Sequence, residues 1–234
     1  NFYGLTSELI NLEGYDITFH GRASHAGGSP SYGINALDAA VVFYTAIGVM
    51  RQQIRDGSRI HGIITNGGAA VNIIPDTASL RIEIRDSDLA YFRELVERVH
   101  TAAKAAASAC GCTVDIEMFE PSICCMKNNR VMTELFKKHL IESGVDAKDI
   151  CDSFVSGGCS DMGNVSQIVP SIHPWLGMVE PDSEGHTVEF LRDAGGEKAA
   201  CEVLRAVSCL AGVGLDILKN PTLLNDIRKD FAGN

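Results

Sequence analysis

Hydrophobic and polar residues alternate along four short stretches in the first half of the chain, at 15–20, 59–65, 80–85 and 114–118. Such alternation predicts β-strands with one buried face and one polar face. Between these strands the hydrophobic period changes to that of an amphipathic helix, at 34–54 and 89–103. In the first of these helices Leu37, Val41 and Tyr44 form one apolar stripe. The predicted element order is therefore β-α-β-β-α-β.

Four amphipathic strands with two helices on one face make a complete two-layer α+β domain, and this order is the ferredoxin-like one. We expect this domain at residues 13–120. The second half predicts helices after Asn129, from Glu197 to Leu218 and after Pro221, with short apolar stretches at 153–156 and 168–178. This pattern is typical of part of an α/β domain, but it contains too few strands for a sheet buried on both faces. Residues 1–12 and 121–234 are expected to be the C-terminal portion of a doubly wound domain.

Composition and charge narrow the class of protein. The 234 residues are 45% hydrophobic, which is enough for a packed core, and the net charge is −10. An acidic chain is repelled by phosphate groups, so nucleic acid and anionic membrane are not expected as partners. No apolar run is long enough to span a bilayer. The 8 cysteines form no C-x-x-C pair, which predicts free thiols and a cytoplasmic protein.

Several catalytic motifs are missing from the sequence. It contains no phosphate-binding loop and no H-E-x-x-H zinc motif. The stretch around Ser160 lacks the second glycine of a nucleophile elbow, so a serine hydrolase has little support. Such an enzyme also needs a base near Ser160, and the sequence identifies none.

Two candidate sites lie in the first half. His25, between Ser24 and Gly27, lies in a loop beside a predicted strand, where its ring nitrogens suit donation to an oxyanion. Asn72 and Arg85 offer an amide and a guanidinium suited to a carboxylate or amide of a substrate. The alternatives are a solvated loop histidine, a turn asparagine and a solvated arginine.

Two further candidates lie in the second half. Ser160, Asp161 and Gly163 form a glycine-rich loop where a ligand can approach the backbone, or a plain turn. Thr187 suits the N-cap of a helix. His186 directly precedes it, and the start of a helix is a rigid position for a metal ligand. One histidine cannot hold zinc, because such sites need three or four ligands.

Taken together, these strings resemble metallopeptidase family twenty in its amidohydrolase branch, which includes aminoacylase, carboxypeptidase G and p-aminobenzoyl-glutamate hydrolase. The resemblance begins at residues 19–27 (FHGRASHAG) and runs through 33–40, 59–64 and 72–76 (NIIPD). It closes with 160–166 (SDMGNVS), 170–174 (PSIHP) and 186–190 (HTVEF). So many ordered motifs in one chain are specific to the family.

The resemblance implies a role for each candidate. Relatives use two zinc ions and a bridging water, and His186 matches their C-terminal zinc ligand. His25 matches a histidine of the dimerisation lid that reaches the partner's active site. Asn72 and Arg85 match lid residues that touch the substrate, while Ser160, Asp161 and Gly163 match a loop lining the pocket. The implied substrates are N-acyl amino acids or dipeptides, and the implied assembly is a homodimer through the lid.

The sequence also departs from the family pattern. Relatives carry an H-x-D pair and two adjacent glutamates before the lid, and neither occurs here. Cys159 stands where relatives more often have serine. We therefore expect a lid joined to the C-terminal part of a zinc amidohydrolase whose N-terminal half is absent, inactive alone. The alternative is a non-catalytic dimerisation or ligand-binding module.

Overall fold

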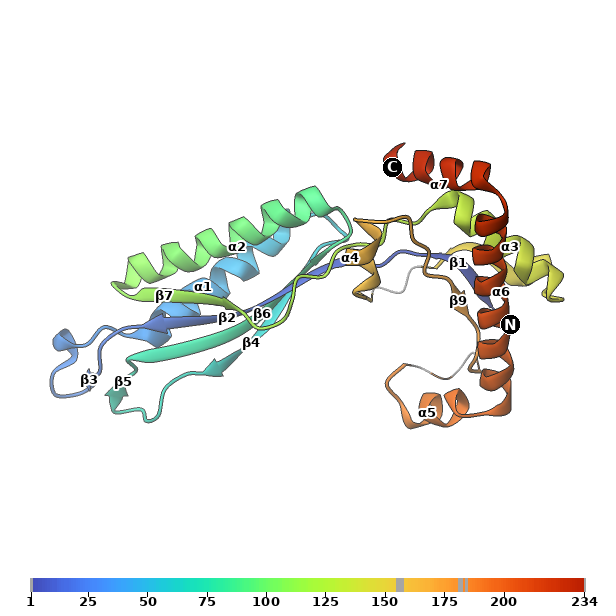
Figure 1. The fold of residues 1–234 in the computed structure, drawn as a ribbon. Helices are drawn as coiled ribbons and strands as arrows, with labels where there is room; N and C mark the ends of the chain where they lie inside the picture. Colours follow the sequence, from blue (N-terminus) through green and yellow to red (C-terminus); the bar gives the residue numbers. More distant parts are fainter. Residues whose placement is uncertain (1, 155–157, 181–182, 184, 234) are drawn as a thin grey trace. The chain divides into compact units, whose positions relative to one another are not determined.

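The computed structural model describes residues 2–154, 158–180, 183 and 185–233 (Figure 1). The chain divides into two compact units. The first, here called the ferredoxin-like unit, is Ile10–Cys125. The second, here called the terminal unit, joins Asn1–Leu9 to Met126–Asn234. Each unit has its own hydrophobic core.

The ferredoxin-like unit is a four-stranded antiparallel sheet with two helices on one face (Figure 1). Its strands are β2 (Asn11–His20), β4 (Arg59–Asn66), β6 (Thr77–Asp86) and β7 (Thr113–Met118), in the order β4-β6-β2-β7. Helix α1 (Ala36–Met50) continues into a 3-10 turn at Arg51–Gln53, and helix α2 is Leu89–Cys110. This arrangement confirms the ferredoxin-like fold predicted from the alternating pattern.

The core of this unit lies between the sheet and the two helices. On β6 the alternate residues Leu80, Ile82 and Ile84 are fully buried, as the period of two predicts. The buried face of α1 is formed by Ala36, Ala39, Ala40, Phe43 and Ile47. The predicted stripe of Val41 and Tyr44 instead points outward, with 48% and 37% of each residue exposed. Small alanines allow α1 to approach the sheet closely, so the alanine side faces the core.

Polar residues begin both helices of the ferredoxin-like unit. The Asn35 side chain accepts a hydrogen bond from the Leu37 N–H at the start of α1. The Asp88 carboxylate accepts bonds from the first turn of α2, which lowers the pKa of Asp88 together with the nearby Arg55. Such caps satisfy backbone donors that have no partner within the helix.

The terminal unit contains a three-stranded sheet in the order β8-β1-β9. Strand β1 (Tyr3–Ser7) is parallel to β8 (Ile150–Phe154) and antiparallel to β9 (Trp175–Leu176). Its helices are α3 (Arg130–Glu142), α4 (Met162–Ser166), α5 (Val188–Ala194), α6 (Glu197–Lys219) and α7 (Pro221–Gly233), with a 3-10 turn at Ala147–Asp149. Of the two short apolar stretches predicted in this half, 153–156 lies partly outside the described residues.

The core of the terminal unit is smaller and includes a buried charge. Tyr3, Leu5, Phe136 and Leu140 are buried against α6 residues. Glu202 of α6 is only 5% exposed and accepts a hydrogen bond from the Tyr3 hydroxyl at 3.1 Å. Burial first, and then the Glu202 carboxylate, raise the pKa of the Tyr3 hydroxyl.

Helix α6 also presents a row of apolar side chains outward. The exposed members are Val203, Leu204, Val207, Leu210, Leu215 and Leu218. An exposed apolar row of this kind usually marks a surface that another part of a protein covers. Across the described ranges, no helix combines the length and the hydropathy that a bilayer crossing requires.

Candidate functional site

Two segments of the ferredoxin-like unit extend from one end of its sheet and meet in a short ladder. The first arm is residues 21–35, between β2 and α1, and the second arm is residues 67–76, between β4 and β6. The β2–β6 pairing ends at His20 and Thr77. Beyond that end, β3 (Ser24–His25) pairs with β5 (Ile73–Ile74) in an antiparallel ladder. The first arm is tied back to the chain before α1, because Arg22 and Ile34 exchange backbone hydrogen bonds. These contacts define the tip of the unit.

This ladder brings His25 and Asn72 together. His25 pairs with Ile73, and the Asn72 carbonyl accepts a hydrogen bond from the Ala26 N–H at 2.9 Å. Both residues are exposed. The Nδ1 atom of His25 faces the backbone of its own turn, where it accepts from the N–H groups of Gly27 and Gly28 at 3.2 and 2.9 Å. Its Nε2 atom and the Asn72 amide are thus available to a ligand.

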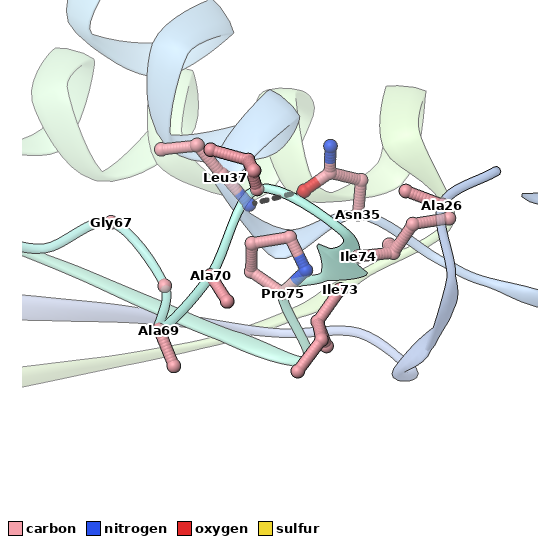
Figure 2. Close-up of a pocket in the computed structure, with 11 residues that line it drawn as sticks. Ala26, Asn35, Leu37, Gly67, Ala69, Ala70, Ile73, Ile74 and Pro75 are labelled. Atoms are coloured by element: carbon pink, nitrogen blue, oxygen red, sulfur yellow. Dashed lines mark hydrogen bonds between the residues drawn. The ribbon is translucent and has the colours of Figure 1, made fainter.

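A cavity of about 400 Å³ lies between the two arms beside this pair. Figure 2 shows part of its lining, with Pro75 between Leu37 and Ile73, and with Ala26 on the neighbouring segment. Residues 67–71 form its outer rim. Gly68 has a φ of +104°, a conformation that favours glycine, and its chain passes close to the Pro75 ring. The lining carries no charged side chain, so the cavity suits a small apolar group.

Arg85 lies elsewhere in the unit. It pairs with Leu12 near the far end of β6. Eight residue positions separate it from Thr77, which corresponds to roughly 27 Å along the strand at about 3.4 Å per residue. Its Nη2 group donates to Glu83 at 2.9 Å, and His61 contacts the same carboxylate. These two partners, Arg85 first, lower the pKa of Glu83. Within one copy of the chain, Arg85 therefore does not join His25 and Asn72.

The Ser160–Gly163 turn belongs to the terminal unit and leads into α4. Its backbone closes when the Gly163 N–H donates to the Ser160 carbonyl at 2.9 Å. The Ser160 hydroxyl accepts from Met162 N–H and contacts the Asp161 carboxylate at 3.4 Å. Ser166, fully buried at the end of α4, accepts from the Lys127 N–H and donates to the Gly163 carbonyl. The turn is thus held from inside the unit, while Asp161 remains exposed. Gly157, at the start of the predicted loop, lies outside the described residues.

His186 is exposed and lies directly before α5. Thr187 caps this helix as predicted, since its hydroxyl accepts from the Phe190 N–H at 3.2 Å, and Glu189 is in the first turn. His186 has a φ of +66° and, in the described part of the chain, no other non-glycine residue has a positive φ. A non-glycine residue in this region costs of order 1 kcal/mol, and such residues gather at functional sites.

The described residues do not form a metal site by themselves. In the ranges that the structure covers, no group of three or more His, Cys, Asp and Glu side chains is arranged to hold a metal ion. His186 alone does not fit a zinc ion, which needs three or four ligands. The eight cysteines keep their thiols, and burial raises the pKa of several of them, including Cys125 and Cys209.

Two parts of the tip are not among the features predicted from the sequence. One is the pair of backbone donors at Gly27 and Gly28, which hold the His25 ring. The other is the apolar rim at residues 69–71, for which the three small or apolar residues after Gly67-Gly68 are a visible signal. Pairing between the arms depends on backbone contacts that the spacing of residues does not reveal.

Known proteins resemble this chain along nearly its whole length. Residues 8–109 match the model of the M20 peptidase dimerisation domain. The chain is 37% identical over 227 residues to the Xaa-Arg dipeptidase of Mus musculus and 34% identical to that of Homo sapiens. Each alignment covers 95% of this chain and 52% of the relative. The chain thus spans about half the length of these curated relatives.

The fold is also found among solved structures. A protein described as an aminohydrolase from methicillin resistant Staphylococcus aureus superposes with a TM-score of 0.71. The superposition covers 92% of this chain and 55% of that one, at 18% sequence identity. This likeness concerns the fold alone, which is α/β. The chain belongs to the M20 peptidase family, and residues 8–109 are its dimerisation domain.

Proposed function

We propose that this protein takes part in hydrolysing the amide bond of a dipeptide or an N-acyl amino acid. The observation that supports this most is the β3–β5 ladder, which places His25 beside Asn72 although 47 residue positions separate them. Their chain neighbours Ala26, Val71 and Ile73 line the cavity, and polar side chains next to such a cavity suit a substrate with a polar amide and an apolar group. The similarity to Xaa-Arg dipeptidases over 95% of the chain supports the same reaction class.

In this proposal each residue has a limited task. His25 donates a hydrogen bond to the carbonyl oxygen of the scissile amide as negative charge develops there. Asn72 donates to or accepts from the substrate amide, and the cavity between the arms takes an apolar side chain. Ser160, Asp161 and Gly163 line the substrate pocket, and Arg85 binds a carboxylate. We place the enzyme in the cytoplasm, where eight thiols remain reduced.

A metal is part of this proposal, with His186 as one ligand of a two-zinc site. The described residues do not complete such a site, so the remaining ligands come from polypeptide outside them. The left-handed backbone of His186 supports its assignment, because non-glycine residues in this conformation cluster at functional sites.

Replacing His25 by alanine should lower kcat for an Xaa-Arg dipeptide roughly a hundredfold, with KM little changed, because one donor to the developing charge is lost. The assay uses the protein isolated in its natural form with zinc, and the 234-residue chain beside it. His20→Ala is the matched control: His20 is also a histidine of the same unit, is partly exposed, and is bonded to Asp115 at 3.0 Å. Equal kcat for His25→Ala and the natural protein would refute the role of His25.

We further propose that two copies pair through β4 and the outer face of α1. Strand β4 is an edge of the sheet, and exposed edges are normally covered or blocked. Ile64 of β4 and Val41 of α1 are 43% and 48% exposed. The Tyr44 hydroxyl donates to the Gly62 carbonyl at 3.2 Å, which joins the two elements into one surface.

The double variant Val41→Lys with Ile64→Lys should weaken dimerisation at least roughly tenfold, because four ammonium groups would meet across a symmetric interface. Sedimentation velocity over a concentration series measures the dissociation constant. Ile141→Lys is the control, since Ile141 is 47% exposed in the terminal unit. A chain that sediments as a monomer before any substitution contradicts the proposal.

The second candidate function is a non-catalytic dimerisation or ligand-binding module. It is favoured by one observation, that the described residues hold no complete group of metal ligands. The assay above separates the two functions through His186→Ala. A metal-dependent hydrolase loses activity in this variant, whereas a binding module shows no hydrolysis in its natural form and keeps its dimer.

A further inference from the structure

The turn that carries His25 is closed by its own hydrogen bonds. The Ser29 N–H donates to the His25 carbonyl at 2.9 Å, and the Ser24 hydroxyl donates to the Ser29 carbonyl at 2.5 Å. On the other side, the β3–β5 ladder and the Ala26–Asn72 bond attach the turn to the second arm. The backbone on both sides of His25 is therefore fixed, and with it the position from which the ring extends.

Within this turn the imidazole accepts two backbone hydrogen bonds at one nitrogen. Nδ1 lies 2.9 Å from the Gly28 nitrogen and 3.2 Å from the Gly27 nitrogen, and both are N–H donors. A ring nitrogen that accepts a hydrogen bond must hold a lone pair, and a neutral imidazole has one such nitrogen. The proton of the neutral ring is then on Nε2.

We infer that Gly27 and Gly28 are positioning residues that hold His25 in its Nε2–H tautomer, so that the ring acts as a hydrogen-bond donor. In this tautomer the exposed nitrogen has no lone pair to offer. His25 is then neither a general base nor a metal ligand through Nε2. The two glycines thus decide which of the several roles open to a histidine the ring can take.

The absence of a side chain at position 28 contributes to this arrangement. A Cβ atom there would lie 3.3 Å from Nδ1 and 3.6 Å from Cγ of His25. The distance to Nδ1 is shorter than an ordinary van der Waals contact. At position 27 the nearest ring atom would be 3.7 Å away, an ordinary contact. Glycine at 28 therefore leaves the ring within reach of both donors, without the shift of a few tenths of an ångström that a Cβ atom there would require.

A donor held in this way recognises an oxygen that carries negative charge. The tautomer stands on the geometry alone, whereas its use on a scissile carbonyl rests on the proposed function. A fixed donor needs no reorientation when charge develops on the oxygen.

Nitrogen NMR of the 234-residue chain with ¹⁵N-labelled histidine and glycine tests this inference directly. At a pH where the imidazoles are neutral, we expect a pyridine-type Nδ1 and a pyrrole-type Nε2 for His25, with the other tautomer below detection. We also expect scalar coupling between Nδ1 and the Gly28 nitrogen across the hydrogen bond. The His25→Gln spectrum assigns the signals. A protonated Nδ1, or the mixture seen in an unfolded peptide, overturns the inference.

Two substitutions of Gly28 distinguish the effect of losing its N–H donor from the effect of adding a side chain. Gly28→Pro removes the N–H, so the coupling should vanish and both tautomers should appear, while kcat of the natural protein falls roughly tenfold. Gly28→Ala keeps the N–H and should keep the Nε2–H tautomer. Unchanged tautomer populations in Gly28→Pro contradict the inference. If the natural protein hydrolyses no amide, the proposed function fails, but the wild-type spectrum still decides the tautomer.

Discussion

Replacing Phe43 by alanine should lower the free energy of unfolding of the ferredoxin-like unit by about 3–5 kcal/mol. Phe43 is fully buried on α1 and contacts the Phe19 ring of β2, with the ring centroids 6.0 Å apart. Its loss leaves a cavity between helix and sheet that neighbouring side chains cannot fill, since the core is closely packed. Hydrogen exchange of β2 and β6 amides measures the effect within this unit.

The control is Tyr32→Ala, which removes another aromatic ring from the same unit. Tyr32 is 72% exposed, so its loss should change the stability by less than about 0.5 kcal/mol. A Phe43→Ala effect below about 1 kcal/mol would mean that α1 is not packed on the sheet as described.

Replacing Glu202 by alanine should destabilise the terminal unit by about 3 kcal/mol, the lower end of the range for breaking a buried ion pair. The carboxylate accepts hydrogen bonds from Tyr3 and from Arg205 Nε, both at 3.1 Å. Without it the buried phenol and the guanidinium lose their shared partner. Arg205 remains partly exposed, with 26% of its side chain accessible, which places the cost at the lower end.

Urea denaturation followed by hydrogen exchange on α6 measures this loss. Glu202→Gln is the control, since it keeps the volume and one acceptor oxygen, and it should cost about 1 kcal/mol. The pKa of the Tyr3 hydroxyl provides a second measurement, because removing the carboxylate removes one of the causes that raise it. A Tyr3 titration unchanged in Glu202→Ala would show that the two groups do not interact.

The sequence predicts the ferredoxin-like unit well, because elements that are buried on one face place hydrophobic residues at regular intervals along the chain. The helix at 89–103 extends further than predicted, to Cys110, because its alanine-rich end favours helix without a clear stripe. Strand β1 escaped prediction since Tyr3, Gly4 and Leu5 are all buried, so no alternation marks the strand.

The candidate residues follow from sequence motifs, whereas their arrangement in space does not. Family motifs pointed to His25 and Asn72, but their meeting depends on a ladder of two residues on each side, too short to leave a pattern. The motifs also pointed to Arg85, yet the order of motifs in the sequence does not show at which end of a strand a residue lies relative to the others. The structure places that guanidinium near the opposite end of β6.

The short ladder at the tip has a consequence for how the length of each arm can vary. Both arms begin at the His20–Thr77 end of the sheet, so the number of residues before Ser24 and after Ile74 sets their register. One inserted residue would move the pairing by one position and turn the imidazole to the other face. Segments that look like ordinary surface loops are therefore expected to resist insertion and deletion as strictly as a core strand does.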